Sequence, residues 1–221
     1  MNLPQAGESK TAFIICGALA REVRTILERH QWRVDLFGIP AIAHMYPERI
    51  GPAVEKKYLA IRANYDRVLV IYGECGTKGS LDHILGAHGL ERVNGPHCYE
   101  MYGGQTFTKL MEEEPGTFFL TDFLVRGFHG TVWRGLGLDR FPELREEYFR
   151  NYRRLVYLAQ TDDPGLQAKA QEISIKLELP LEIIHSGYSP FEKRLVAFME
   201  QNRTGNSESH STCDKDREGR L

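Results

Sequence analysis

The sequence predicts an α/β protein with a mostly parallel, doubly wound sheet, built as a single domain with one irregular insertion. Short apolar runs rich in β-branched residues alternate with segments of helical spacing along most of the chain. This alternation is typical of right-handed crossovers between parallel strands. The clearest run, residues 67–72 (RVLVIY), is almost continuously apolar, as expected of a strand that helices cover on both faces.

The order of elements follows from these runs and from the glycines and prolines between them. Strands are expected at residues 11–15, 32–39, 67–72, 90–93, 116–120, 154–159 and 181–184. Helices are expected at residues 18–27, 51–61, 81–88, 105–113, 142–152, 164–179 and 190–201. Residues 122–141 mix glycine, aromatic and charged residues without a period, and we interpret them as an insertion or lid.

Length and composition favour one globular domain. The chain has 221 residues, 42% of them hydrophobic and 26% charged, which suffices for one substantial core. We expect a flexible N-terminus over residues 1–10, the α/β domain over residues 11–202, and a disordered tail over residues 203–221. The tail contains Cys213 and almost no apolar residues.

Charge and hydropathy narrow the partners and the compartment. Lysine and arginine number 28 against 30 acidic residues, so the net charge of -2 gives no reason to expect a nucleic-acid partner. No apolar run approaches the roughly 20 residues that span a bilayer, and the polar N-terminus does not resemble a signal peptide. We therefore expect a cytoplasmic protein without a membrane partner. In a reducing compartment, thiols more often act as metal ligands, nucleophiles or core packing than as disulfides.

Three cysteines occupy equivalent places in the predicted fold. Cys16, Cys75 and Cys98 each follow a predicted strand, at the point where the chain turns toward a helix or loop. Because the carboxyl ends of parallel strands share one edge, these thiols are expected to converge there and hold a metal. Gly17 and Gly76 directly follow two of the cysteines, and we expect their backbone N–H groups to approach the bound centre closely.

The metal and the accompanying groups stay open at this point. Three thiolates suit zinc with a free fourth position, and they equally suit an iron–sulfur cluster with one iron left for a substrate. His97 and Glu100 are candidates for a fourth ligand or for proton transfer. Glu74, which flanks the Cys75 turn, is a further catalytic candidate, and either it or Glu100 is expected to support the metal ligands. The competing interpretation is that the cysteines merely fill the core, since free cysteine is often buried. Neither a dinucleotide-binding, P-loop, hydrolase nor cobalamin motif is present.

A family resemblance adds to this interpretation. Residues 15–22 (ICGALARE), 72–76 (YGECG), 97–98 (HC) and 116–121 (GTFFLT) together resemble the uncharacterised family called domain of unknown function 1638. The resemblance covers residues 11–200, and the family pattern has a cysteine matching Cys98. It implies a link to corrinoid proteins and methyltransferases for methylated amines, without supplying a reaction. Residues 122–124 (DFL) stand where the family pattern continues with a Pro-Gly-Trp-like segment.

The functional expectation is a cysteine-ligated metalloprotein, containing iron–sulfur or zinc, that handles a small substrate in methylated-amine or other corrinoid-linked one-carbon metabolism. If the protein is catalytic, a metal-dependent transferase or lyase is expected. Two alternatives stay open. The first is a non-catalytic accessory protein that delivers a metal or assists a corrinoid methyltransferase. The second is a metal-free enzyme with Cys75 as its nucleophile.

Overall fold

The computed structural model of the chain describes residues 9–204. The expectations for the flexible N-terminus up to residue 8, and for the tail from residue 205 with Cys213, lie outside these described residues. None of the helices in the described range is long and apolar enough to cross a membrane.

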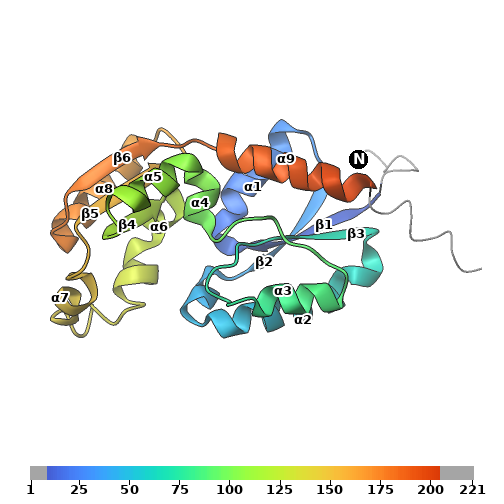
Figure 1. Ribbon diagram of the computed structural model, residues 1–221, viewed down its shortest axis with the longest axis horizontal. Coiled ribbons are helices and arrows are strands. Elements are labelled where there is room, and N and C mark those ends of the chain that lie inside the picture. The colour runs from blue at the N-terminus through green and yellow to red at the C-terminus, as the bar shows by residue number, and fades with distance from the viewer. Residues whose placement is uncertain (1–8, 205–221) are drawn as a thin grey trace, which may run out of the picture.

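The described residues form six strands, which are divided between two three-stranded sheets toward opposite ends of the molecule (Figure 1). Every pairing within the two sheets is parallel. The first sheet contains, in spatial order, β2 (Val34–Ile39), β1 (Thr11–Cys16) and β3 (Arg67–Ile71). The second contains β4 (Thr117–Thr121), β5 (Arg154–Ala159) and β6 (Leu181–His185). We call the units around these two sheets the first lobe and the second lobe.

The parallel α/β class predicted from the sequence is confirmed, but the strands belong to two sheets instead of one. The division falls where the sequence predicted a weak strand at residues 90–93. That segment contributes only an isolated bridge between Val70 and Arg92. Pro96 follows it closely and has no N–H group to continue a ladder. The first sheet therefore ends at β3, and the chain passes on to the second lobe.

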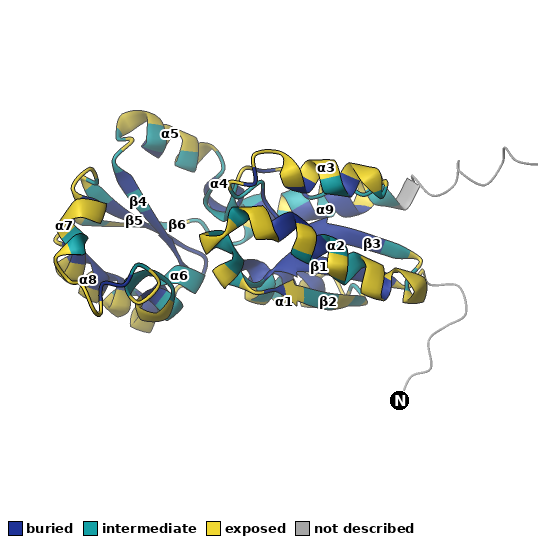
Figure 2. Ribbon diagram, turned by 90° about the horizontal axis from the view of Figure 1, so that it is seen from below, coloured by how far each residue is buried: buried dark blue, intermediate teal, exposed yellow. Residues whose placement is uncertain are grey.

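Helices cover both sheets. In the first lobe α2 and α3 lie on one face of the sheet, and α1 and α9 lie on the other (Figures 1 and 2). The helices of the described residues are, in chain order, α1 (Ala20–Arg29), α2 (Ile50–Ile61), α3 (Ser80–Ala87), α4 (Cys98–Gly103), α5 (Gln105–Glu113), α6 (Asp122–Phe128), α7 (Leu144–Phe149), α8 (Pro164–Leu177) and α9 (Ser189–Thr204). Shorter turns of helix are η1 (Gly17–Leu19), η2 (Ala41–Met45), η3 (Pro47–Arg49), η4 (Arg62–Asn64) and the π-helical η5 (His129–Trp133).

Alternation along the strands of the second lobe decides which helices cover which face. Leu120 and Tyr157 share a buried cluster with residues of α6 and α8. Phe119 and Val156, one position before each of these, instead share a cluster with Leu110 of α5. Successive side chains of a strand point to opposite faces, so β4 and β5 are buried on both sides, whereas β6 has Glu182 and His185 exposed.

The stretch interpreted as an irregular insertion begins with a regular helix. Thr121 ends β4 and caps α6, because its Oγ1 accepts a hydrogen bond from the backbone N–H of Leu124 at 3.4 Å. Val125 and Phe128, three residues apart, bury the inner face of this helix. The Thr121 cap and the spacing of Val125 and Phe128 were the only local sequence signals of this helix. The glycines that follow interrupt the helical period and made these signals hard to recognise.

The last helix returns to the first lobe. After β6, α9 packs its fully buried Phe191 and Leu195 into the core of the first sheet. The Phe191 ring lies edge-on to Tyr102 of α4, with ring centroids 5.5 Å apart. Arg194 donates two hydrogen bonds to the Glu100 carboxylate, at 2.6 and 2.8 Å. The chain thus passes between the lobes twice, and α4 and α9 are joined where it does so.

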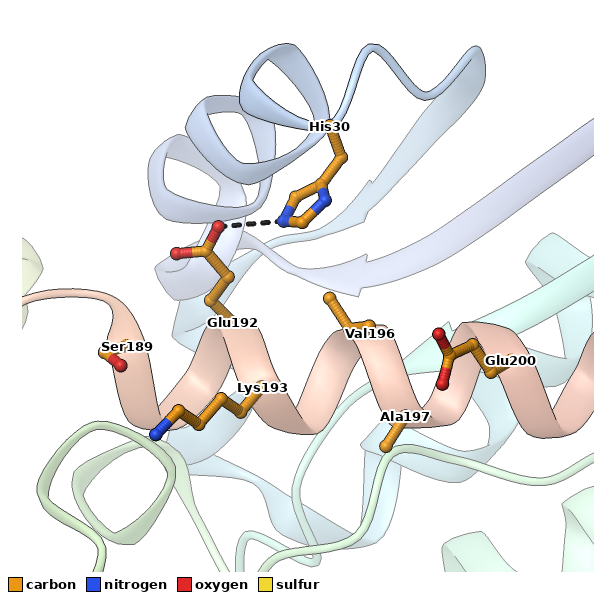
Figure 3. Close-up of a pocket in the computed structure, with 7 residues that line it drawn as sticks. All are labelled: His30, Ser189, Glu192, Lys193, Val196, Ala197 and Glu200. Carbon is orange, nitrogen blue, oxygen red and sulfur yellow. Dashed lines mark hydrogen bonds and ion pairs between the residues drawn. The ribbon is translucent and has the colours of Figure 1, made fainter.

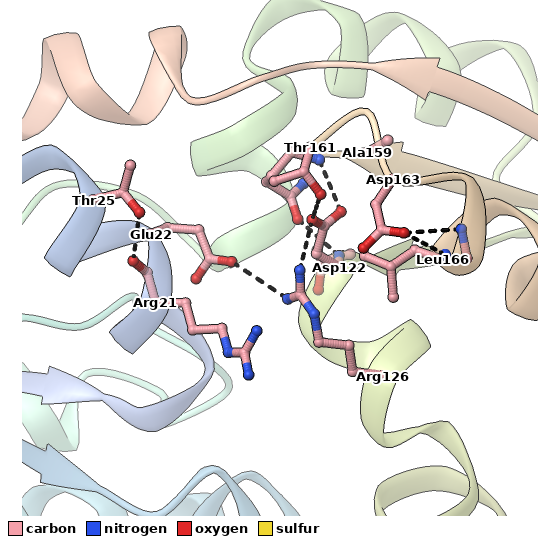
Figure 4. Close-up of polar contacts among 12 residues, drawn as sticks. Arg21, Glu22, Thr25, Asp122, Arg126, Ala159, Thr161, Asp163 and Leu166 are labelled. Atoms are coloured by element: carbon pink, nitrogen blue, oxygen red, sulfur yellow. Dashed lines mark hydrogen bonds and ion pairs between the residues drawn. The ribbon is translucent and has the colours of Figure 1, made fainter.

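The carboxyl ends of the two sheets face one another. Directly after β1, η1 contacts α6, which directly follows β4. Arg126 of α6 lies between two carboxylates, with Nη2 donating to Asp122 at 3.1 Å and Nη1 lying 4.0 Å from Glu22 of α1 (Figure 4). Burial raises the pKa of Glu22, and the positive charge of Arg126 opposes that shift. Ligands of parallel sheets bind at such edges, so this region is where a site is expected.

Asp122 is the polar centre of the second lobe. It is fully buried, and its Oδ1 accepts hydrogen bonds from the Tyr157 hydroxyl at 2.6 Å and the Gln160 backbone N–H at 2.9 Å. Its Oδ2 accepts hydrogen bonds from Thr161 and Arg126. One carboxylate thereby joins the start of α6 to the end of β5.

Asp122→Ala should destabilise the protein by about 3–5 kcal/mol, because it leaves buried donors and a partly buried guanidinium without their acceptor. The free energy of unfolding from urea titration measures the effect. Asp162→Ala, which removes an exposed carboxylate that accepts one hydrogen bond from Gln167, is the matched control and should cost less than about 1 kcal/mol. Equal losses in the two variants would show that Asp122 does not hold the lobe together.

Phe191→Ala should cost about 3–5 kcal/mol, since it removes a fully buried ring from the first core. Ile175→Ala on α8, where the side chain is 69% exposed, should change stability by less than about 0.5 kcal/mol. Thermal unfolding of the two variants checks this prediction. If Phe191→Ala melts like the wild type, α9 does not pack on the first lobe as described.

Candidate functional site

The three predicted thiols lie at the carboxyl edge of the first sheet. Cys16 is the last residue of β1 and is 3% exposed, Cys75 lies in the turn after β3, and Cys98 begins α4. Because β1 and β3 are neighbouring parallel strands, the first two cysteines reach the same edge. The Cys75 backbone N–H donates to the Pro96 carbonyl at 2.7 Å, which brings the Cys75 turn beside the segment that leads into Cys98.

The three thiols share one region, because the charge of one thiol affects the pKa of another. Burial raises the pKa of Cys16. Burial, followed by the negative charge of Cys16, raises the pKa of Cys75 to about 12. Burial, followed by the charges of Cys16 and Cys75, raises the pKa of Cys98 as well. Since such effects operate only between nearby groups in a region of low dielectric constant, the structure brings the three thiols within electrostatic reach of one another.

Tyr72 lies among these thiols. It directly follows β3 and is fully buried, and its hydroxyl interacts with the Cys16 thiol and makes no other hydrogen bond among the described residues. Burial raises its pKa, and the charges of Cys16, Cys75 and Cys98 and the contact with the Cys16 thiol raise it further. The Cys16 thiol is therefore the polar neighbour of this buried hydroxyl.

The chemistry of the donors fits a thiophilic metal, whereas their present placement does not form a finished site. Within residues 9–204, no group of three or more His, Cys, Asp or Glu side chains is arranged so that it could hold a metal ion. Three neighbouring thiols nevertheless match the preference of zinc and iron for sulfur. The thiol side chains would have to turn toward a common centre as it binds.

His44 is a neighbour of the thiols that the sequence interpretation did not single out. It lies in η2, and its Nε2 is 3.9 Å from the Cys16 Sγ. Its Nδ1 lies 2.8 Å from the Ala41 carbonyl oxygen, and its ring stacks on Tyr72 with centroids 5.7 Å apart. The sequence offered only a positional signal for His44, because the loop that contains it follows β2, and the fold places β2 beside β1. No local motif surrounds this histidine.

The two predicted proton-transfer residues at α4, His97 and Glu100, make contacts that stabilise the helix and its packing. His97 caps the helix, with Nδ1 accepting from the Glu100 backbone N–H at 3.4 Å. The His97 ring packs edge-on against Phe107, with centroids 5.1 Å apart, and burial lowers its pKa. Glu100 is held by both guanidinium N–H groups of Arg194. These contacts give both residues a structural reason to stand where they do.

Glu74 organises the turn that carries Cys75. Its carboxylate accepts hydrogen bonds from the Gly76 N–H at 2.8 Å, the Thr77 hydroxyl at 2.9 Å and the Gly79 N–H at 3.3 Å. Burial alone would raise its pKa, but these hydrogen bonds prevail and lower it. Cys75 has φ of 50°, a left-handed conformation that is uncommon for a residue other than glycine. Glu74 thus supports a strained backbone at a predicted metal ligand.

The two predicted glycines have steric roles at this edge. A Cβ on Gly17 would lie 3.0 Å from the Ile39 carbonyl oxygen, so glycine lets the end of β1 pass close to β2. Gly76 has φ of +81°, which continues the left-handed turn begun by Cys75. Their predicted contact with a bound centre stays a prediction.

A separate surface pocket lies along α9, between that helix and the end of α1 (Figure 3). Its volume is about 410 Å³, and the His30 Nε2 lies 2.9 Å from the Glu192 Oε1 at its edge. It is lined by His30, Ser189, Glu192, Lys193, Val196, Ala197 and Glu200. None of these lining residues belongs to the thiol region, so the pocket is not part of this candidate site.

Comparison with known proteins gives a family and no function. Neither the search of curated proteins nor the search of solved structures found a match. The family model described as "Protein of unknown function (DUF1638)" matches residues 39–195. This range contains Cys75, Cys98 and His44, while Cys16 lies before it. Since the match spans more than half of the chain, the protein belongs to the DUF1638 family.

Proposed function

We propose that this protein is a metalloprotein in which Cys16, Cys75 and Cys98 bind a thiophilic metal centre, an iron–sulfur cluster or zinc. The observation that carries the proposal is that three thiols, from three separate segments, lie within electrostatic reach of one another at the carboxyl edge of a parallel sheet. The fully buried Tyr72 hydroxyl interacts with the Cys16 thiol at the same place.

The pKa values favour a metal over a free nucleophile. Catalytic cysteines have a lowered pKa, because the thiolate is the reactive form. Here burial raises the pKa of all three thiols, and the charges of neighbouring thiols raise the pKa of Cys98 further and that of Cys75 to about 12. A bound cation would offset this repulsion and displace the thiol protons, so the same arrangement that disfavours a nucleophile suits a metal ligand.

The residues around the thiols would then act as supports. The Glu74 carboxylate holds the Cys75 turn through three hydrogen bonds. The Tyr72 hydroxyl, which interacts with the Cys16 thiol, would lie beside that ligand. When bound, zinc would supply a Lewis acid, and a cluster would supply an iron that a substrate can reach. His97 and Glu100, fixed by their contacts on α4, would position the segment that carries Cys98.

The wider role that we propose rests on the family resemblance. We propose a cytoplasmic protein that acts on a small substrate, such as a methylated amine or thiol, in corrinoid-linked one-carbon metabolism. This role agrees with the family resemblance. The partners would then be that substrate and a corrinoid protein or methyltransferase. Turnover of candidate methyl donors by the metal-loaded protein separates an enzyme, either a transferase or a lyase, from an accessory protein.

Anaerobically purified full-length protein, reconstituted with iron and sulfide or with zinc, should hold a stoichiometric metal centre. Broad visible absorbance from thiolate–iron charge transfer identifies a cluster, and colourless bound zinc identifies the single ion. Cys16→Ser, Cys75→Ser and Cys98→Ser should each lose most of the metal, because each removes a thiolate ligand. Metal analysis after gel filtration provides the measurement.

Cys213→Ser is the matched control, since it removes a thiol that lies outside the described residues. This variant should keep the wild-type metal content. Undiminished metal in all three of the other variants would refute the ligand assignment. Circular dichroism on each variant confirms that a loss of metal is not a loss of fold.

In the metal-free folded protein, Cys75 should react with iodoacetamide at pH 7 at least about tenfold more slowly than in the denatured chain. The reason is that a pKa raised to about 12 leaves very little thiolate at that pH. Peptide mass spectrometry of quenched time points measures the rate at each cysteine. Rapid alkylation of Cys75 in the folded state would instead support the metal-free enzyme.

A further inference from the structure

One contact between a carboxylate and a guanidinium crosses from the first lobe to the second. Glu22 of α1 is 3% exposed, and its Oε1 lies 4.0 Å from Nη1 of Arg126 on α6. The Nη2 of the same guanidinium donates to Asp122 of the second lobe at 3.1 Å. Arg126 therefore lies between a carboxylate of its own lobe and a carboxylate of the other lobe (Figure 4).

The two carboxylates hold the guanidinium to different degrees. Asp122 is fixed within the second lobe, because it also accepts three hydrogen bonds from residues at the end of β5 and just after it. The contact of Arg126 with Glu22 is the longer of the two and crosses the boundary between the lobes. The weaker half of this bridge is thus the half that joins the lobes.

The environment of Glu22 makes its charge costly. Burial raises the pKa of Glu22, and the negative charge of Asp122 raises it further. The charge of Arg126 and a hydrogen bond with the Tyr102 hydroxyl act in the opposite direction without cancelling the shift. Glu22 therefore takes up a proton at a higher pH than an ordinary glutamate.

The other titratable and charged groups around this carboxylate come from its own helix and from three further segments. They are Arg21 on α1, Tyr102 on α4, Asp122 and Arg126 on α6, and Tyr188 directly before α9. Burial raises the pKa of both tyrosines, so they stay neutral while a carboxylic acid titrates.

We propose that the contact between Glu22 and Arg126 is a pH-dependent latch between the two lobes, closed when Glu22 is ionised and released when Glu22 takes a proton from solvent. Protonation removes one charge of the pair, while Asp122 keeps Arg126 on the second lobe. The latch therefore opens on the side of Glu22. This inference does not depend on the proposed metal centre.

Release of the latch would loosen one part of the boundary between the lobes. The affected elements are η1 and α6, which are in contact where the carboxyl ends of the two sheets face one another. The Tyr99 ring stays packed against Phe119 of β4, with centroids 5.9 Å apart, and keeps α4 on the second lobe. We therefore expect a local opening at η1 and α6 instead of a separation of the lobes.

The latch differs from a structural ion pair in its effect on stability. Because the pKa of Glu22 is raised in the folded protein, folding favours the protonated form. The stability that this form contributes is present at low pH and is lost as the pH rises through the raised pKa. Glu22→Gln imitates the protonated form, so it should release the latch without lowering Tm.

Hydrogen–deuterium exchange of the full-length protein, measured by peptide mass spectrometry, tests the proposal. At about pH 7.5, peptides covering η1 and α6 should exchange at least about threefold faster in Glu22→Gln than in the wild type. In the wild type, the same increase over the intrinsic rate of the unfolded chain should appear as the pH falls toward about 5. Glu22→Gln should show no such pH dependence.

Glu178→Gln is the matched control, because it removes an exposed ion pair with Arg145 inside the second lobe. It should leave exchange in η1 and α6 at the wild-type rate. Wild-type exchange in Glu22→Gln would overturn the latch, and so would equal acceleration in Glu178→Gln. A full pH response that persists in Glu22→Gln would assign the titration to another group and refute the proposal. A lowered Tm of Glu22→Gln would identify the contact as a structural ion pair instead.

Discussion

Parallel pairing of β1 between β2 and β3 is the constraint on which the candidate site depends. The pairing aligns the carboxyl ends of three strands, so whatever follows each strand meets at one edge. Cys16 is the last residue of β1, Tyr72 and Cys75 follow β3, and the η2 turn with His44 follows β2. The fourth contribution, Cys98, arrives because the backbone of residues 95–96 is hydrogen-bonded to the Cys75 turn. Apart from Tyr72 and Cys75, which share one turn, these groups are far apart in the sequence.

The second lobe is attached to the first by a polar network and by a buried apolar contact. Asp122 concentrates four donors at the end of β4 and β5, and Arg126 extends this network toward Glu22 of the first lobe. Phe191 of α9 instead anchors the returning chain by burial in the first core. The two connections hold the carboxyl ends of both sheets opposite each other.

Burial raises the pKa of the thiols and so favours their protonated form. A low-dielectric environment penalises the thiolate form, and three neighbouring thiols penalise it further by repulsion. The energetic consequence is that the thiols favour their protonated form in this environment. The left-handed backbone of Cys75, supported by hydrogen bonds to Glu74, is a second local cost that the fold sustains at the same place.

The sequence by itself determined the parallel α/β class, most strands and helices, and the position of Cys75 in the turn after a strand, because hydrophobic periodicity and turn residues are local signals. Cys16 instead ends β1, and Cys98 begins α4 without a strand before it. The sequence did not determine that the strands divide into two sheets, since pairing is a choice among distant segments and the 90–93 run differs little from a true strand. Only the tertiary structure placed His44 beside Cys16 and engaged His97 and Glu100 in α4 and its contacts with α9. The physical reason is that side-chain neighbours across a sheet edge depend on strand order and on loop paths, which leave no periodic trace in the chain.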